Sequence, residues 1–101
     1  MKFFEQLGFG AILSDWETGR VLEVNHQAEK LLGGNRVDIV GKKISILMSC
    51  GVSVKSDFGA GLLQFDGGVV PVKVKARSLM LQGHSLLLHL CQEDSASVLR
   101  A

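Results

Sequence analysis

The spacing of apolar positions divides the 101-residue chain into helical and extended segments. Residues 2–7 place their apolar side chains on one helical face, so we expect a short amphipathic helix there. One or two turns are not stable alone, so this helix must dock on the sheet of its own domain or on a second subunit. Its apolar face consists of Phe3, Phe4 and Leu7.

Two short apolar runs follow, at residues 9–14 and 20–24, and the connection between them ends in Gly19. A hairpin-length connection with a glycine predicts two antiparallel strands. Asn25 comes next, before apolar residues at helical spacing, and its side-chain oxygen can accept an amide at the start of a helix. We therefore expect Asn25 to be a structural residue that joins the second strand to a helix ending at Gly33-Gly34.

The middle of the chain holds two small apolar clusters, at residues 37–40 and 44–48, separated by Gly41-Lys42-Lys43. Clusters of this length predict single helical turns rather than full helices. Residues 49–59 are mixed and contain glycine, and we interpret them as a loop or a poorly formed helix.

The last third of the chain has the alternation typical of strands. A strand leading into Asp66-Gly67-Gly68 carries a hairpin signal, and the next strand points valines one way and basic residues the other. Pro71 falls on the basic side, which suits an edge strand or a strand end. Gln82-Gly83 predicts a second turn. The strand over residues 84–91 is apolar on both faces, which indicates a strand that is central or has one face under a helix or a partner.

The predicted order is helix, two strands, short helices, three strands and a final short helix that Asp94 would cap. This order indicates an α+β domain with a five-stranded antiparallel sheet and helices on one face. Its length corresponds to a single domain over residues 1–101.

Composition narrows the function classes. The formal net charge of +1 argues against nucleic acid or a membrane as a direct partner. A mean hydropathy of +0.27 is high for a domain this small, which favours a partner that covers part of its surface. With no membrane-length apolar run and no CxxC spacing between Cys50 and Cys91, we expect a cytoplasmic protein with reduced thiols.

Five motifs in this order resemble those of PAS domains, the sensory modules of bacterial signalling proteins. They are an apolar strand ending in Asp15 with a turn to Gly19, a strand ending in Asn25, a capped helix ending in Gly33, the step Val40-Gly41-Lys42, and the hairpin Asp66-Gly67 followed by a Pro-Val strand.

The resemblance implies a PAS core over residues 9–93, preceded by a docking and dimerisation helix at 2–7 and followed by the start of an output helix at 94–101. It also implies a signal-input and homodimerisation module of a larger protein: a histidine kinase of a two-component system, a cyclase or a transcriptional regulator. Glu93 and Asp94 stand where the family has its junction to the output domain. The symmetric dimer would use Phe3, Phe4 and Leu7 together with the outer face of the sheet.

Two departures from the family pattern stand out. The helix before the third strand is shortened to about ten residues, Ser49 to Phe58. Gln64 and Phe65 also occupy the place where many family members have a basic residue that pairs with the helix glutamate, so Glu29 has no predicted partner from that position.

Candidate chemistry is sparse. Some members of the family bind haem or flavin, but residues 49–58 contain neither the haem-ligating histidine nor the Asn-Cys-Arg-Phe signature of flavin photochemistry. We therefore expect no cofactor and no metal. His89, inside a leucine-rich strand, is the one histidine worth testing as a ligand. No nucleophile motif or phosphate-binding loop is present, so we do not expect an enzyme.

Two alternatives stay open. A roadblock- or longin-like interaction scaffold has a similar strand order but carries one long helix between its second and third strands. The row Lys73, Lys75 and Arg77 could be an anion site, although most such rows are solvated faces that protect a strand.

Overall fold

The structure, a computed structural model, describes residues 9–48, 57–63 and 67–93. The expected helices at 2–7 and 94–101 lie outside the described residues, as do residues 49–56 of the shortened segment predicted over Ser49 to Phe58. The end of that segment was predicted wrongly as loop or helix, because Asp57 and Phe58 already pair with β4 as the start of β3. In chain order the elements are β1 (Gly10–Asp15), β2 (Val21–Val24), α2 (His26–Leu32), α3 (Arg36–Ile39), α4 (Ile44–Leu47), β3 (Asp57–Leu63), β4 (Val69–Leu81) and β5 (His84–Glu93).

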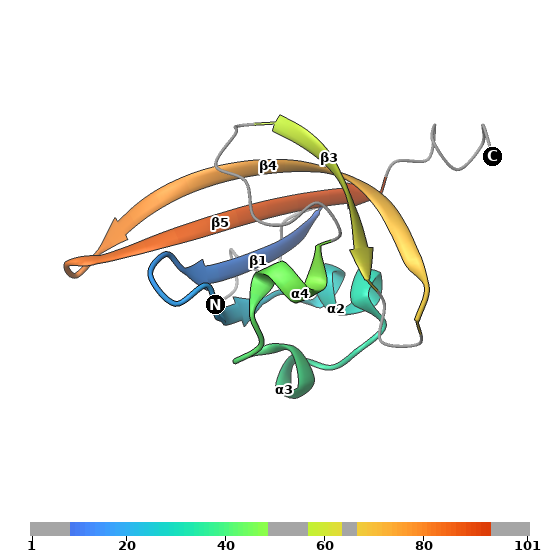
Figure 1. Ribbon diagram of the computed structural model, residues 1–101, viewed down its shortest axis with the longest axis horizontal. Coiled ribbons are helices and arrows are strands. Elements are labelled where there is room, and N and C mark those ends of the chain that lie inside the picture. Colours follow the sequence, from blue (N-terminus) through green and yellow to red (C-terminus); the bar gives the residue numbers. More distant parts are fainter. Residues whose placement is uncertain (1–8, 49–56, 64–66, 94–101) are drawn as a thin grey trace.

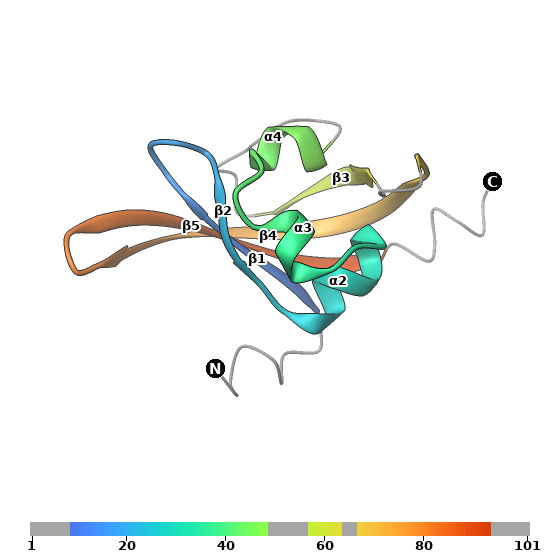
Figure 2. The same ribbon diagram turned by 90° about the horizontal axis from the view of Figure 1, so that it is seen from below.

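The strands form one antiparallel sheet in the order β2-β1-β5-β4-β3. β5 lies in the centre, as its two apolar faces predicted, with β1 on one side and β4 on the other. The three helices cover one face of this sheet (Figures 1 and 2). The predicted α+β arrangement is therefore confirmed.

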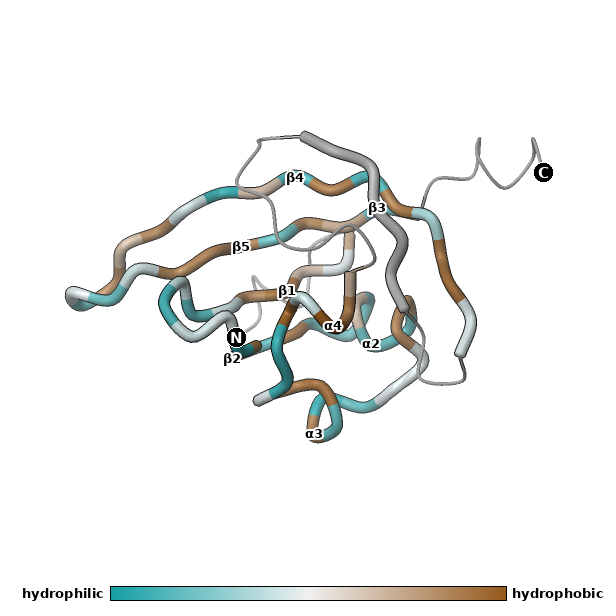
Figure 3. Tube along the Cα trace, in the orientation of Figure 1, coloured by the Kyte–Doolittle hydropathy of each residue, from teal (hydrophilic) through white to brown (hydrophobic). Residues whose placement is uncertain are grey.

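The register of the sheet separates a core face from an outer face. On β4, Val72, Val74 and Ala76 are buried beneath the helices, whereas Lys73 and Lys75 are exposed on the opposite face. Figure 3 shows this alternation of hydrophobic and hydrophilic residues along β4. The core between the layers consists of Ile12, Val21, Val24, Ala28, Leu32, Ile39, Ile44, Leu47, Met48, Val72, Val74 and Cys91.

The β4–β5 hairpin closes through the predicted turn at Gln82-Gly83, with Leu81 opposite His84. Both turn residues have positive φ, 51° and 81°, which is the geometry of a type I′ turn and matches the twist of the strands. The hairpin is long, and Figure 2 shows its tip extending beyond the helices.

Pro71 does not mark an edge strand, because β4 lies between β5 and β3. The alternative prediction, a position near a strand end, describes it: Pro71 is the third residue of β4 and precedes the first β4–β5 pair, Val72 opposite Glu93. Pro71 pairs with Gly61 of β3 and has no partner on β5, so its missing amide leaves the β4–β5 ladder intact.

After β2, residues 26–47 contain three short helices of seven, four and four residues. The single turns predicted at 37–40 and 44–48 are therefore present, each within one residue of its predicted start. A long helix like that of the roadblock and longin scaffolds is absent from residues 26–48. Across the described ranges, no helix combines the length and apolarity that a membrane crossing requires.

Candidate functional site

Asn25 connects three elements at the point where β2 turns into α2. Its Oδ1 accepts hydrogen bonds from the amides of Ala28, at 3.0 Å, and Ala11, at 2.8 Å. Its Nδ2 donates to the carbonyl of Phe9 at 2.9 Å. The side chain is completely buried. Asn25 thus caps α2, as predicted, and also fixes the start of β1 against that helix.

Tight packing at the start of β1 reinforces this junction. A Cβ added at Gly10 would lie 2.9 Å from Leu31 Cδ1 and 3.1 Å from Ala28 Cα, so α2 approaches β1 closely only because this residue is glycine. At its other end, α2 stops at Gly33, whose φ of 70° is left-handed.

The other motif residues of the first half also shape backbone turns. Asp15 Oδ1 accepts from the amides of Glu17, at 2.8 Å, and Thr18, at 3.1 Å, which closes the β1–β2 turn before Gly19. The Gly41 amide donates to the carbonyl of Val21 at 2.8 Å. These hydrogen bonds, with the positive φ of Gly19 and Gly41, support structural roles for Asp15, Gly19 and Gly41.

The helix glutamate finds its partners locally. Glu29 Oε2 accepts from the Arg36 amide at 2.8 Å, and its Oε1 lies 3.4 Å from His26 Nδ1. Arg36 also forms a two-pronged ion pair with Glu23, through Nε to Oε1 and through Nη2 to Oε2. The hydrogen bond from Arg36 lowers the pKa of the Glu23 carboxyl below its ordinary value. This pair ties α3 to β2.

The interior offers little reactive chemistry. His89 is fully buried on the core face of β5, and its cross-strand neighbours are Ile12 on β1 and Ala76 on β4. Cys91 lies two residues further along the same face, and burial raises the pKa of its thiol to about 12. Within the described part of the chain, no three His, Cys, Asp or Glu side chains gather closely enough to hold a metal ion. The apolar neighbours of His89 on the sheet supply no second ligand.

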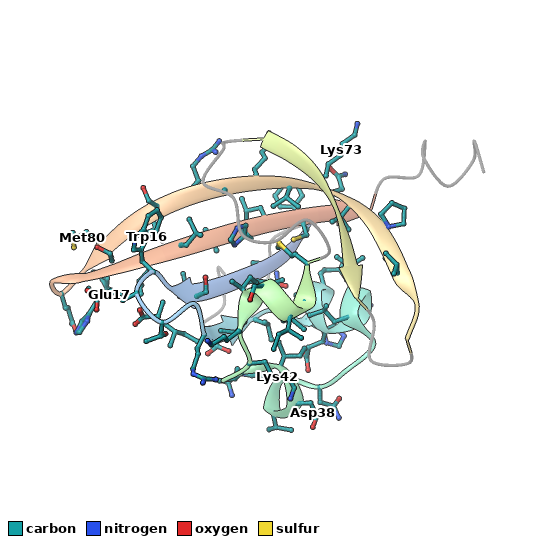
Figure 4. The ribbon with its side chains drawn as sticks, viewed as in Figure 1. Trp16, Glu17, Asp38, Lys42, Lys73 and Met80 are labelled. Carbon is teal, nitrogen blue, oxygen red and sulfur yellow. The ribbon has the colours of Figure 1, made fainter. Side chains whose placement is uncertain are left out.

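The outer face of the sheet is the surface that the described helices leave uncovered. Leu88 and Leu90 of β5 lie there beside Leu13 of β1, and all three are half-buried. Lys73 and Lys75 of β4 run alongside them, and Figure 4 shows Lys73 pointing away from the helices. A groove of about 740 Å³ lies over this part of the face, lined by Phe9, Lys73, Val74, Lys75, Arg77, Leu90 and Gln92.

A second exposed apolar surface, which was not predicted from the sequence, lies at the tip of the β4–β5 hairpin. Leu79, Met80 and Leu81 are 43%, 70% and 60% exposed there, and Trp16 in the neighbouring turn is 47% exposed. Three apolar residues directly before the predicted Gln82-Gly83 turn were the signal for it. These side chains are exposed because the tip of the β4–β5 hairpin extends beyond the helices that cover the sheet (Figure 2).

Several predicted site residues lie outside the described residues: Phe3, Phe4 and Leu7, Asp66 and Asp94. Gly67 has a positive φ of 96°, as a hairpin glycine does. Glu93 is the last residue of β5. The structure thus brings Asn25, Gly10 and α2 together, and the proposed junction at Glu93 lies at the same end of the sheet, because Gly10 pairs with Cys91 two residues before it.

The chain matches the family model described as the PAS fold over residues 2–92. No curated protein sequence matches it.

Solved structures with this fold are numerous. The PAS domain of an HTR-like protein from Haloarcula marismortui has a TM-score of 0.77 at 21% identity, with 91% of each chain covered. A PAS domain from Desulfitobacterium hafniense has a TM-score of 0.81 at 18% identity, over 93% of this chain and 100% of its own. A PAS domain from a two-component sensor histidine kinase has a TM-score of 0.80 at 10% identity, over 92% and 91%. At these identities the likeness is one of fold.

Proposed function

The chain belongs to the PAS family, and from that premise we propose that it is a signal-input and homodimerisation module of a larger signal-transduction protein. PAS domains are sensory modules of signalling proteins, and one structural neighbour comes from a two-component sensor histidine kinase. The observation that carries the proposal is the outer face of the sheet, which the described helices leave uncovered, with its row of half-buried leucines, Leu13, Leu88 and Leu90. A contiguous apolar row on such a face favours a contact surface.

We infer that the module is not itself a catalyst. Within the described residues, Cys91 is the cysteine from which a nucleophilic site would be built, and it lies fully buried on the core face of β5 two residues from the equally buried His89. Burial raises the pKa of the Cys91 thiol to about 12, so the thiol is protonated at neutral pH. A buried, protonated thiol supports a structural role.

The proposed dimer combines the outer face with the helix predicted at residues 2–7. Phe3, Phe4 and Leu7 would cover the leucine row of a second copy in a symmetric contact. A change of packing at this contact would then reach the output domain through β5, because that strand runs from the sheet centre to Glu93.

Sedimentation velocity at tens of micromolar tests the dimer. We expect twice the monomer mass for the unmutated chain and a lower mass for the variant Phe3→Glu/Phe4→Glu. Val37→Glu is the matched control, because Val37 is 79% exposed on α3, on the opposite side of the sheet. An unmutated monomer contradicts the proposal.

The signal does not require a resident cofactor. Side chains from β4, including Val72 and Val74, occupy the core between sheet and helices. We propose that the purified protein is colourless, without a Soret band and without flavin absorption, and that it responds through partner contacts or a weakly held apolar molecule. A coloured protein would contradict this, and His89→Ala would then test the ligand.

A further inference from the structure

We propose that the free edge of β4 at the hairpin tip, residues 78–81, pairs with an extended segment of a partner polypeptide. The segment would add a strand antiparallel to β4 and would carry a carboxylate beside Arg77. The inference rests on the proposed function in one step, the choice of a partner over a second copy. It goes beyond that function by assigning a second contact surface and the chemistry of its ligand.

β4 extends past the strand that covers its edge. The β3–β4 ladder begins at Asp57 opposite Lys75, so within the described residues 76–81 pair with β5 alone. Figure 1 shows β3 beside the half of β4 that lies away from the hairpin tip. All four residues from 78 to 81 are exposed, whereas Ala76 before them is buried. The open edge therefore covers residues 78–81.

The two-residue turn determines which backbone groups face this edge. Leu81 and His84 flank the turn and therefore exchange backbone hydrogen bonds, and every second residue of β4 before Leu81 does the same with β5. The N–H and C=O groups of Ser78 and Met80 thus point away from β5. Within the described part of the chain, neither residue has a backbone partner on that side. The edge offers two donors and two acceptors to an added strand.

Two hydrogen bonds support this alternation of the backbone groups. The carbonyl of Ser85, which lies opposite Met80, points away from β4 and accepts from the Trp16 amide at 3.0 Å. The carbonyl of Ala76 lies on the open side of β4 and accepts from Nη1 of the Arg77 side chain at 2.9 Å. The backbone at the hairpin tip is therefore oriented as an open edge requires.

The edge lacks the features that normally protect one. Exposed edge strands usually carry lysine, proline or a bulge that blocks further pairing. Residues 78–81 are Ser-Leu-Met-Leu, without a charge or a proline, and their register with β5 is uninterrupted. Leu79 and Leu81 lie on the outer face of the sheet, and Met80 lies on the helix side, where its Sδ is 3.9 Å from Ser85 Oγ. Apolar side chains thus border the open backbone groups on both faces.

Arg77 places a positive charge at the start of the open edge. Its hydrogen bond to the preceding carbonyl holds the guanidinium beside the backbone that an added strand would approach. Lys75, on the same face, stands opposite Asp57, and Asp15 of β1 accepts amides of its own turn. Residues 76–92 of the hairpin include no carboxylate. An anionic side chain of the partner, opposite Arg77, therefore complements this end of the edge.

Other occupants fit the edge less well. A helix does not satisfy an open strand edge, because its own backbone groups are paired internally. Two copies paired through this edge would also keep the outer-face contact of the proposed dimer. Each copy would then have two different two-fold contacts, which gives larger assemblies instead of the dimer expected above. An extended segment satisfies the four backbone groups directly, as in other cases of strand addition.

The test uses the full chain, isotopically labelled, and the peptide acetyl-Val-Phe-Val-Thr-Glu-amide. In antiparallel register its first valine stands opposite Leu81 and its glutamate opposite Arg77. Without peptide, the amides of Ser78 and Met80 should exchange with solvent at least about tenfold faster than those of Arg77 and Leu79, which bond to β5. The peptide should slow exchange at Ser78 and Met80 and shift the resonances of residues 77–81.

Methylated peptides distinguish a strand ladder from loose apolar contact. N-methylation of the phenylalanine and the threonine removes the two peptide amides that face β4, so this peptide should bind at least about tenfold more weakly. N-methylation of the central valine removes an amide that faces away from β4. That peptide is the matched control and should bind like the parent peptide.

Variants of the chain test the same ladder from the other side. Ser78→Pro removes an amide that faces the open edge and leaves the bonds between β4 and β5 intact, so binding should weaken about tenfold. Ser78→Ala keeps that amide and should bind like the unmutated chain. Arg77→Gln should weaken binding of the peptide about two- to fivefold and should not change binding of a peptide with glutamine in place of glutamate.

Equal affinity of the two Ser78 variants, or of the two methylated peptides, would overturn the proposal. So would slow exchange at Ser78 and Met80 without peptide, which would show that the chain itself already pairs with the edge. A larger sedimenting mass that Ser78→Pro lowers would assign the edge to a second copy and would also overturn it. Sedimentation separates this inference from the proposed function: a monomer that binds the peptide refutes the dimer alone, and a dimer that does not bind it refutes this inference alone.

Discussion

Removal of the Asn25 side chain should destabilise the protein more than loss of a helix cap alone. The variant Asn25→Ala leaves three backbone groups without the partner they have in the structure: the amides of Ala28 and Ala11 and the carbonyl of Phe9. The Ala28 amide is one of the first amides of α2, which have no partner within the helix. Ala28 and Ala11 both have no exposed surface, so water is excluded from either residue.

The magnitude follows from these environments. Loss of an Asn cap costs about 0.5–2 kcal/mol. A buried amide left without an acceptor adds about 1–3 kcal/mol. The two together give about 2–4 kcal/mol, since the contributions share one side chain and do not add fully. With a urea m-value of about 2 kcal/mol/M, the unfolding midpoint should fall by about 1–2 M.

Urea denaturation followed by circular dichroism measures this shift. The matched control is Asn35→Ala, because Asn35 stands at the N-cap of α3, is exposed, and makes no capping hydrogen bond through its side chain. The free energy of unfolding of Asn35→Ala should lie within about 0.5 kcal/mol of that of the unmutated chain. Hydrogen exchange at the Ala11 amide should accelerate in Asn25→Ala. Equal midpoints for the two variants would refute the assignment of these hydrogen bonds.

Four further predictions concern single positions. Gly10→Ala would place a methyl carbon 2.9 Å from a side-chain carbon of α2, so overpacking should cost about 1–3 kcal/mol in the same denaturation assay, and an unchanged midpoint would count against the close approach. Gln82→Asn should raise the midpoint slightly, by up to about 1 kcal/mol, because asparagine tolerates the φ of 51° better than glutamine; a loss of stability would argue against the type I′ turn. Cys91 should resist iodoacetamide at pH 8 until the chain unfolds, as peptide mass mapping can show. Its folded pKa of about 12 exceeds the ordinary value of 9.0. The stability that the protonated thiol contributes is therefore complete below pH 9 and is lost as pH rises toward 12. Arg36 lowers the pKa of Glu23 from its ordinary value of 4.5, so the Glu23 carboxylate contributes stability above pH 4.5 and loses that contribution as pH falls through the lowered pKa. The variant Glu23→Gln should therefore reduce the difference between the unfolding midpoints at pH 7 and pH 3. An unaltered difference would contradict the Glu23–Arg36 ion pair.

Sequence reasoning succeeded where a signal was local and repeated. The alternation along β4 gave its two faces, the asparagine before a helical repeat gave the cap at Asn25, and Gln82-Gly83 gave the hairpin turn. In each case the side-chain pattern or the backbone geometry is determined within a few residues. The α+β class followed from the order of these elements.

Contacts between distant segments were beyond the same reasoning. Nothing near Asn25 in the sequence indicates that its amide reaches Phe9, because that bond depends on how β1 lies against α2. The Glu23–Arg36 pair likewise forms only once α3 packs beside β2. The groove beside Lys73 and Leu90 depends on the register of two strands, which a one-residue shift would have changed completely.

The pairing of Gly10 with Cys91 has a mechanical consequence. The first residue of β1 and the end of β5 are antiparallel neighbours, so the chain enters and leaves the sheet at the same place. Tension between the two flanking segments would therefore load the β1–β5 hydrogen bonds one pair at a time, beginning at Gly10, rather than all together in shear. The bond from Asn25 to the Phe9 carbonyl lies at that same end, so a pull on the flanks would reach the first turn of α2 before it reached the rest of the sheet.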